Sequence, residues 1–113
     1  MKYRMIVLDL DGTLTNAKKE IMPRTQAALM EAQQRGVRIV LASGRPTYGI
    51  VPLAEQLKLA ENDGYILAYN GGKIVSCRTG EVVFNQELAP ELVPLLHDEA
   101  KAAGMEILTY QGE

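Results

Sequence analysis

The sequence predicts an α/β fold built on a parallel sheet, because short apolar runs alternate with longer amphipathic segments along the chain. Three of these runs, at 5–10, 37–42 and 65–69, have the length of strands. The two segments between them, at 23–35 and 50–57, carry apolar residues at helical spacing. Strand–helix–strand–helix–strand is the order expected when helices connect parallel strands and cover the sheet.

Individual residues support these elements. The apolar, β-branched run Met5–Leu10 is typical of a strand that is buried on both faces of a sheet. Pro23 suits the first position of a helix, and Gly36 ends that helix. Pro52 lies inside the second helical pattern, so it predicts either a kink or the true start of that helix.

The pattern changes after Gly72. Two short strands at 73–77 and 81–85 are predicted to form a hairpin that turns at Thr79-Gly80. An amphipathic helix follows at about 90–103, and a further strand at 105–110. We therefore divide the chain into a core at 1–82 and the beginning of a second unit at 83–113.

Composition narrows the classes of function. The 113 residues include twelve Lys and Arg and fourteen Asp and Glu, so there is no excess of basic residues to bind the phosphates of a nucleic acid. We therefore expect no nucleic acid as a partner. The apolar runs are far shorter than the ~18 residues of a membrane helix, and Asp9 interrupts the first of them too early for a secretion signal. A single cysteine, Cys77, cannot form an internal disulfide. We expect a cytoplasmic protein with no membrane partner.

Two acidic residues, Asp9 and Asp11, follow the first predicted strand. Carboxylates this close repel each other unless a cation or a shared proton relieves them, and oxygen-only ligands favour Mg²⁺. The alternative is a loop pair that makes turn and cap hydrogen bonds. The apolar strand before the pair and Gly12-Thr13 after it favour the metal interpretation.

The segment Ser43–Pro46 follows the second predicted strand and precedes a helix. A hydroxyl, a glycine N–H and a helix N-terminus together predict an anion site, although a capping serine and a turn glycine would give the same pattern. Right-handed crossovers make the strands parallel, so Asp9, Ser43 and Asn70 are expected at one edge of the sheet. There, Asn70-Gly71-Gly72 either contacts a substrate or only turns the chain.

The segment Asp9–Leu14, with the sequence DLDGTL, resembles the first motif of the haloacid-dehalogenase-like (HAD) superfamily of phosphohydrolases. Ser43–Pro46 resembles its second motif in the Cof-type branch, where Asn70-Gly71 after the third strand is also usual. The resemblance extends over the whole chain. It implies a Mg²⁺-dependent phosphatase with a Rossmann-like parallel sheet core, incomplete in this chain, and the beginning of a mobile α/β cap domain at 83–113.

The resemblance also implies roles for individual residues. Asp9 is the nucleophile that forms an aspartyl-phosphate, and Asp11 is the acid for the leaving alcohol and then the base for water. Both bind the Mg²⁺, Asp9 through its side chain and Asp11 through its backbone carbonyl. The remaining site residues are assigned to phosphate or substrate binding: Gly12, Ser43, Gly44, Arg45 and Asn70.

Members of this branch supply a lysine and further acidic metal ligands in two later motifs, and nothing after Ser43 matches either motif. We therefore expect an N-terminal portion of such an enzyme, which hydrolyses small, sugar-phosphate-like metabolites only as an intact longer chain. One alternative is a phosphate-binding fragment or module without turnover. An aspartyl-phosphate receiver domain ranks last, because Ser43 rather than an aspartate ends the second strand.

The family's sheet has its first strand at the centre, with further strands on the other side. In this chain Met5–Leu10 would therefore have an unpaired apolar edge. An open edge of this kind is a template for pairing with another chain, so we expect self-association.

Overall fold

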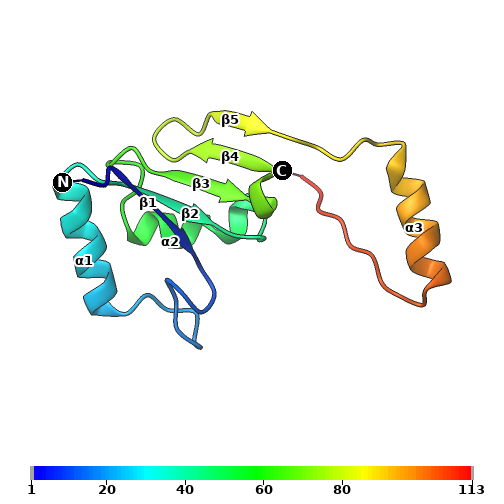
Figure 1. The fold of residues 1–113 in the computed structure, drawn as a ribbon, viewed down its shortest axis with the longest axis horizontal. Helices are drawn as coiled ribbons and strands as arrows, with labels where there is room; N and C mark the ends of the chain where they lie inside the picture. Colours follow the sequence, from blue (N-terminus) through cyan, green and yellow to red (C-terminus); the bar gives the residue numbers. More distant parts are fainter. Residues whose placement is uncertain (1, 113) are drawn as a thin grey trace.

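One mixed five-stranded sheet organises residues 2–112, the part of the chain that the computed structural model describes (Figure 1). The strand order along the sheet is the same as the order along the chain. The first three strands are parallel and the last two are antiparallel: β1 (Met5–Asp9), β2 (Arg38–Ala42), β3 (Tyr65–Ala68), β4 (Lys73–Ser76) and β5 (Val82–Asn85). The predicted α/β class and the predicted hairpin are thereby confirmed.

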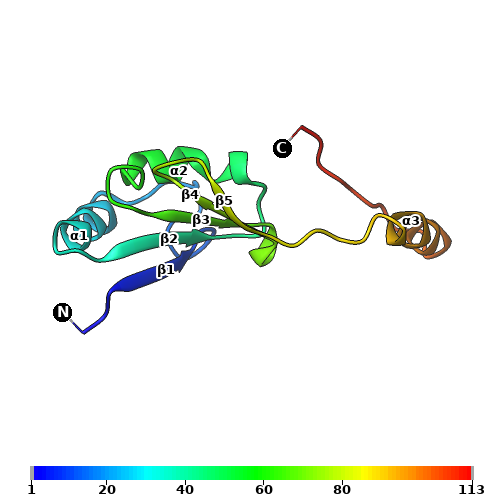
Figure 2. The same ribbon diagram turned by 90° about the horizontal axis from the view of Figure 1, so that it is seen from above.

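Helices α1 (Pro23–Gln34) and α2 (Val51–Gln56) lie on the same side of the sheet (Figure 2). Pro52 is the second residue of α2, so it begins this helix rather than kinking it. The apolar core lies between these helices and the sheet face that they cover, and its most deeply buried side chains include Leu10, Ile39, Leu41, Ile50, Leu57 and Leu59. Each such side chain contributes about 1.5–3 kcal/mol to folding.

The opposite face of the sheet is not covered by a helix within residues 2–112 (Figure 2). Strand β1 lies at the edge of the sheet, and its side chains alternate between half-buried and exposed. Met5 is 48% exposed and Val7 is 56% exposed on the uncovered face. The prediction that this strand is buried on both faces is therefore wrong for the described chain, because burial of a face depends on what packs against it. In β2, by contrast, Ile39, Val40 and Leu41 are all buried.

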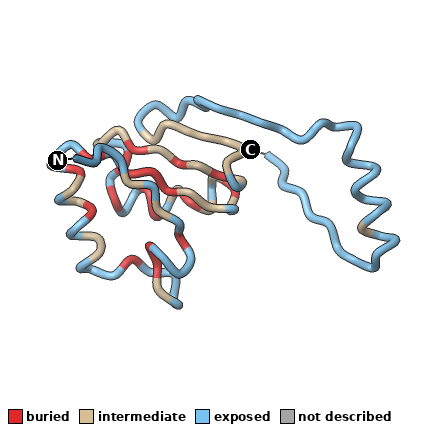
Figure 3. The backbone as a smooth tube through the Cα atoms, viewed as in Figure 1, coloured by how far each residue is buried: buried red, intermediate tan, exposed pale blue. Residues whose placement is uncertain are grey.

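Helix α3 (Leu92–Ala102) lies away from the sheet, and residues 103–112 lead from it back toward β3 (Figures 1 and 2). Almost every residue after Cys77 is exposed, including the leucines on the apolar side of α3 (Figure 3). No strand forms at 105–110, so that prediction is wrong, since a strand needs a partner and none is available there among the described residues.

The division of the chain at residues 82 and 83 stays a prediction. The last pairing of the sheet joins Lys73 to Asn85, three residues beyond that boundary. Among residues 2–112, no helix has both the length and the apolar character needed to cross a membrane.

Candidate active site

The carboxyl ends of the three parallel strands meet at one edge of the sheet, which we call the carboxyl edge. Asp9, the last residue of β1, pairs in register with Ala42, the last residue of β2. Ser43 follows directly, and its N–H donates to the Leu67 carbonyl of β3 at 3.0 Å. Asn70 lies in the single turn η2 (Tyr69–Gly71) that follows β3. The structure thus brings together the residues that the strand pattern predicted to share one edge.

The loop after β1 is anchored by two core leucines. Leu10 is fully buried and Leu14 is 3% exposed. The Thr13 N–H donates to the Leu10 carbonyl and the Leu14 N–H donates to the Asp9 carbonyl, both at 3.1 Å. Gly12 adopts a φ of +84°, a left-handed conformation that favours glycine, so the chain can reverse here.

This anchoring keeps both carboxylates at the surface of the carboxyl edge. Asp9 and Asp11 are exposed, although the leucines on either side of Asp11 in the loop are buried. The Thr13 hydroxyl lies 3.4 Å from Asp9 Oδ2, a long hydrogen bond. Thr13 therefore braces the loop near the Asp9 side chain.

The loop after β2 is joined by hydrogen bonds to the turn after β3. The Asn70 N–H donates to the Ser43 carbonyl at 3.1 Å, and the Tyr69 N–H donates to the Arg45 carbonyl at 3.0 Å. Within the loop, Ser43 Oγ accepts from the Arg45 N–H at 3.1 Å. Because a hydroxyl both accepts and donates, the Ser43 O–H remains able to donate to an anion.

Gly44 lies directly against the side chain of Asn70. A Cβ on residue 44 would lie 3.0 Å from Asn70 Oδ1 and 3.2 Å from Nδ2, closer than ordinary contact. Asn70 itself has φ 55° and ψ 35°, a left-handed conformation that asparagine tolerates better than most residues. The pair therefore places a carboxamide beside the Gly44 backbone at the carboxyl edge.

Arg45 makes a contact that the sequence did not predict. Its Nη2 and Nε donate to Asp11 Oδ1 and Oδ2, the Nε bond being 3.2 Å long, and its Nη1 donates to the Gly49 carbonyl at 3.1 Å. The Arg45 side chain is 25% exposed and that of Asp11 is 53% exposed. The two residues are 34 positions apart in the chain, and no motif spacing indicates the contact.

The donors at the carboxyl edge are oxygen atoms, the type of ligand that Mg²⁺ prefers, but they are few. Mg²⁺ prefers carboxylate and carbonyl oxygens and retains several of its waters, so it needs few protein ligands. The Asp9 carboxylate is exposed and suits this role, whereas Arg45 occupies the Asp11 carboxylate, which leaves the Asp11 backbone carbonyl. Among residues 2–112, no cluster of three or more acidic, His or Cys side chains could hold a metal.

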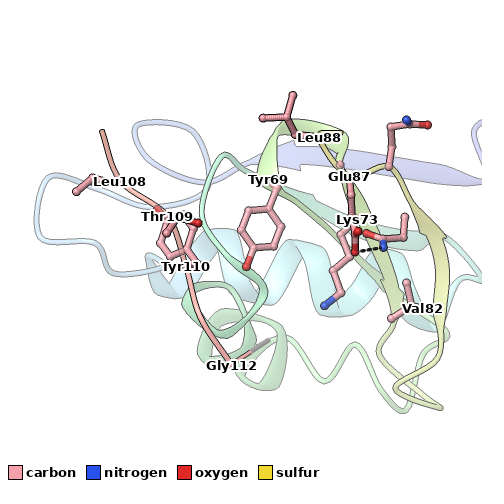
Figure 4. A pocket seen from close by; sticks show the side chains of 12 residues that line it. Tyr69, Lys73, Val82, Glu87, Leu88, Leu108, Thr109, Tyr110 and Gly112 are labelled. Carbon is pink, nitrogen blue, oxygen red and sulfur yellow. Dashed lines mark hydrogen bonds between the residues drawn. The ribbon is translucent and has the colours of Figure 1, made fainter. Parts of the chain in front are cut away.

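A cavity of about 700 Å³ lies beside η2, between the hairpin, the connection after β5 and the terminal segment 108–112 (Figure 4). The rings of Tyr69 and Tyr110 meet edge to face there, with their centroids 5.6 Å apart. Lys73 and Glu87 are among its polar lining residues. No sequence pattern indicates this cavity, because its walls come from segments far apart in the chain.

Cys77 is not suited to act as a nucleophile. Its side chain is half-buried, and burial raises the pKa of the thiol from 9.0 to about 11. The thiol is therefore neutral near pH 7, and a neutral thiol is a poor nucleophile.

Comparison with known proteins identifies the family. Residues 6–113 match the family model of haloacid dehalogenase-like hydrolases. The chain belongs to this family. A solved haloacid dehalogenase-like hydrolase from Bacteroides thetaiotaomicron is 53% identical and superposes with a TM-score of 0.86, covering 96% of this chain and 41% of that one.

Several curated relatives carry phosphatase names. "Putative phosphatase YxeH" of Bacillus subtilis (strain 168) is 38% identical over 96 residues, which are 85% of this chain and 36% of the relative. "Pyridoxal phosphate phosphatase YbhA" of Escherichia coli (strain K12) is 39% identical over 59 residues, which are 52% of this chain and 22% of the relative. The chain thus spans about a third or less of the length of these relatives. The predicted family is confirmed.

Proposed function

We propose that this chain supplies the carboxyl-edge residues of a Mg²⁺-dependent phosphatase that acts on small, sugar-phosphate-like metabolites. The observation that carries the proposal is the convergence of two exposed carboxylates with the Ser43 hydroxyl and the Gly44 backbone at one sheet edge. Relatives of the chain are named as phosphatases, one of them for pyridoxal phosphate. Hydrolysis of a phosphate ester requires the same elements, namely a nucleophile, a proton donor and donors to the phosphoryl oxygens.

Asp9 is the proposed nucleophile. Its carboxylate oxygen forms a bond to phosphorus while the bond from phosphorus to the substrate oxygen breaks, and Asp11 gives a proton to the departing alkoxide. Asp11 then takes a proton from water, whose oxygen attacks phosphorus, so that phosphate leaves and the Asp9 carboxylate is regenerated. Proton transfer by a positioned carboxyl group accelerates such steps by roughly 10²–10⁴-fold.

The phosphoryl group is held by donors from the loops after β1, β2 and β3. Ser43 contributes its hydroxyl, Gly12 and Gly44 contribute backbone amides, and Arg45 and Asn70 contribute side chains. A Mg²⁺ bound by Asp9 and the Asp11 carbonyl would offset the repulsion between a carboxylate and a doubly charged phosphate ester. The cavity beside η2 is lined by none of these donors but by the neighbouring Tyr69, so we assign it to the alcohol part of a substrate rather than to the phosphoryl group.

Turnover is proposed to require residues beyond those of this chain. The carboxyl edge holds two acidic side chains, and no cluster of three metal-binding groups exists within residues 2–112. Each missing electrostatic partner costs about 10²-fold or more in rate, by analogy with single oxyanion-site donors. We therefore expect the 113-residue chain alone to bind phosphate without useful turnover, which is the second candidate function.

Three finer assignments belong to the same proposal. The Asn70-Gly71 pair after β3 favours the Cof-type branch, and a single cysteine fits a reducing, cytoplasmic location. Residues 83–113 are proposed to begin the cap domain, in agreement with the position of α3 away from the sheet (Figure 1).

The experiment uses a longer protein that carries these residues. We expect Mg²⁺-dependent release of phosphate from small monoesters, abolished by a chelator. Asp9→Asn and Asp11→Asn should each abolish most of the activity, and Ser43→Ala should weaken substrate binding. Asp98→Asn, which removes the same charge from exposed α3, serves as the matched control and should leave the rate unchanged. Retained activity in Asp9→Asn would refute the nucleophile assignment.

A further inference from the structure

The backbone of Arg45 lies in the loop after β2, and its side chain contacts the loop after β1. The Arg45 N–H donates to Ser43 Oγ, and the Arg45 carbonyl accepts from the Tyr69 N–H. These two hydrogen bonds hold its backbone at the proposed phosphate site. Its guanidinium crosses to the neighbouring loop and donates to both carboxylate oxygens of Asp11. A single residue thus connects the groups proposed to hold phosphate with the proposed proton donor.

The contact places Asp11 in a definite orientation. A guanidinium that donates through two nitrogens to two carboxylate oxygens holds the carboxylate in its own plane. The Nη1 bond to the Gly49 carbonyl, at 3.1 Å, holds the guanidinium from its other side. In this arrangement the Asp11 carboxylate faces Arg45 rather than a substrate.

A bound phosphate would compete with Asp11 for Arg45. The guanidinium fork matches phosphate and carboxylate oxygens equally well in geometry. A phosphate dianion carries twice the charge of a carboxylate, so at equal distance its Coulomb attraction for Arg45 is about twice as large. Phosphate held by Ser43 and Gly44 would lie beside the backbone of Arg45, within the same loop.

We propose that Arg45 is a positioning residue that holds Asp11 in the phosphate-free protein and transfers to the phosphoryl oxygens when phosphate binds. The transfer releases the Asp11 carboxylate, which is then free to receive from the solvent the proton that it gives to the leaving group, and to turn toward that group. Asp11 thus becomes available only after the phosphoryl group is in place. The inference rests on the proposed function in one respect, that the carboxyl edge binds phosphate.

A double-mutant cycle on the 113-residue chain tests the exchange, with inorganic phosphate as the probe and no metal present. Asp11→Asn and Asp9→Asn each remove one negative charge from the carboxyl end of β1 and the loop that follows it, so both reduce repulsion of phosphate. Only Asp11 competes for Arg45, so Asp11→Asn should tighten phosphate binding more than Asp9→Asn does. Exposed ion pairs contribute roughly 0.2–1 kcal/mol, which sets the expected additional gain in phosphate affinity at about 1.4- to fivefold.

The additional gain should disappear when Arg45 is also replaced. The two variants to compare are then Arg45→Gln/Asp11→Asn and Arg45→Gln/Asp9→Asn, which should bind phosphate equally tightly.

NMR gives a second readout that a purely structural role would not change. Phosphate should shift the side-chain N–H signal of Arg45 and the carboxyl carbon signal of Asp11 together, with one apparent Kd. In Arg45→Lys, which keeps the charge but lacks the fork, phosphate should still bind while the Asp11 signal stays nearly constant.

Four results would overturn the exchange. They are equal gains from the two Asp→Asn variants, an additional gain that persists in Arg45→Gln, a constant Asp11 signal during saturable phosphate binding, and no saturable phosphate binding in any variant. The outcome is separable from that of the proposed function. If the longer protein hydrolyses phosphate esters but the phosphate titrations show no coupling between Arg45 and Asp11, only the exchange is overturned. If the titrations show the coupling but the longer protein does not hydrolyse phosphate esters, only the phosphatase assignment is overturned.

Discussion

Replacing Gly44 with alanine tests whether the Asn70 side chain must lie against the backbone of the proposed phosphate loop. The added Cβ would lie 3.0 Å from Asn70 Oδ1 and 3.2 Å from Nδ2. The carboxamide must then retreat by a few tenths of an ångström to reach ordinary contact. Because it lies at the end of a side chain, the retreat displaces a potential phosphate donor without unfolding the loop.

The magnitude follows from the distance dependence of hydrogen bonds. These bonds are typically 2.7–3.2 Å long and are essentially lost at about 3.6 Å, so a shift of this size removes a substantial part of one bond. A hydrogen bond to a charged group contributes roughly 1.5–3 kcal/mol. We therefore expect Gly44→Ala to weaken phosphate binding by about 1 kcal/mol, or about fivefold in Kd, with only a small change in the free energy of unfolding.

Gly49→Ala is the matched control, because its added Cβ would meet the nearest Arg45 side-chain atoms at 3.4 and 3.5 Å, which is ordinary contact. Titration calorimetry with inorganic phosphate gives the Kd, and urea unfolding gives the stability of each variant. The reasoning is refuted if Gly44→Ala binds phosphate as tightly as Gly49→Ala and the unaltered chain do.

Three further outcomes are expected. Because burial raises the pKa of Cys77 to about 11, its thiol should react with iodoacetamide at pH 8 about 100-fold more slowly in the folded chain than in the urea-unfolded chain. The contribution of this thiol to the free energy of unfolding is complete below about pH 9 and is lost as the pH rises toward 11. The open β1 edge should cause concentration-dependent self-association, which light scattering measures. Val7→Lys should reduce this self-association, because it places a charge on the exposed face of β1. A strictly monomeric unaltered chain would contradict this expectation. In urea titrations, Leu57→Ala in the core should lower the free energy of unfolding by about 2–5 kcal/mol. Leu92 is exposed, so Leu92→Ala should change this free energy by less than about 0.5 kcal/mol. Similar losses in the two variants would be inconsistent with the observed burial.

The sequence predicted the parallel core and the common edge because both follow from local rules. The alternation of apolar runs with helical patterns defines β1 to β3, and the handedness of crossovers then places Asp9, Ser43 and Asn70 at the same end. The hairpin of β4 and β5 follows from the turn residues Thr79-Gly80. None of these inferences requires knowledge of a contact between distant residues.

Features that depend on distant contacts were not predicted. The pairing of Arg45 with Asp11 requires the relative position of two loops, which neither loop's residues define. The exposure of Val7 depends on whether anything covers β1, and an apolar strand has the same composition in either case. Residues 105–110 have the composition of a strand but lack a partner among residues 2–112, so the same pattern gives no strand.

The agreement between sheet order and chain order bears on how the molecule is made. Each strand from β2 to β5 pairs with the strand that directly precedes it in the chain. Strand β1 has its partner only when β2 has been made, since Met5 pairs with Arg38. During synthesis on the ribosome, each strand from β2 onward therefore emerges when its partner is already available. Within residues 2–112, the sheet can grow from β1 to β5 by addition at one side, and no strand of this segment has to insert between two that are already paired. The hairpin pairing of β4 with β5 is local in the chain, whereas the parallel pairing of Met5 with Arg38 must first close a long loop and is expected to form more slowly.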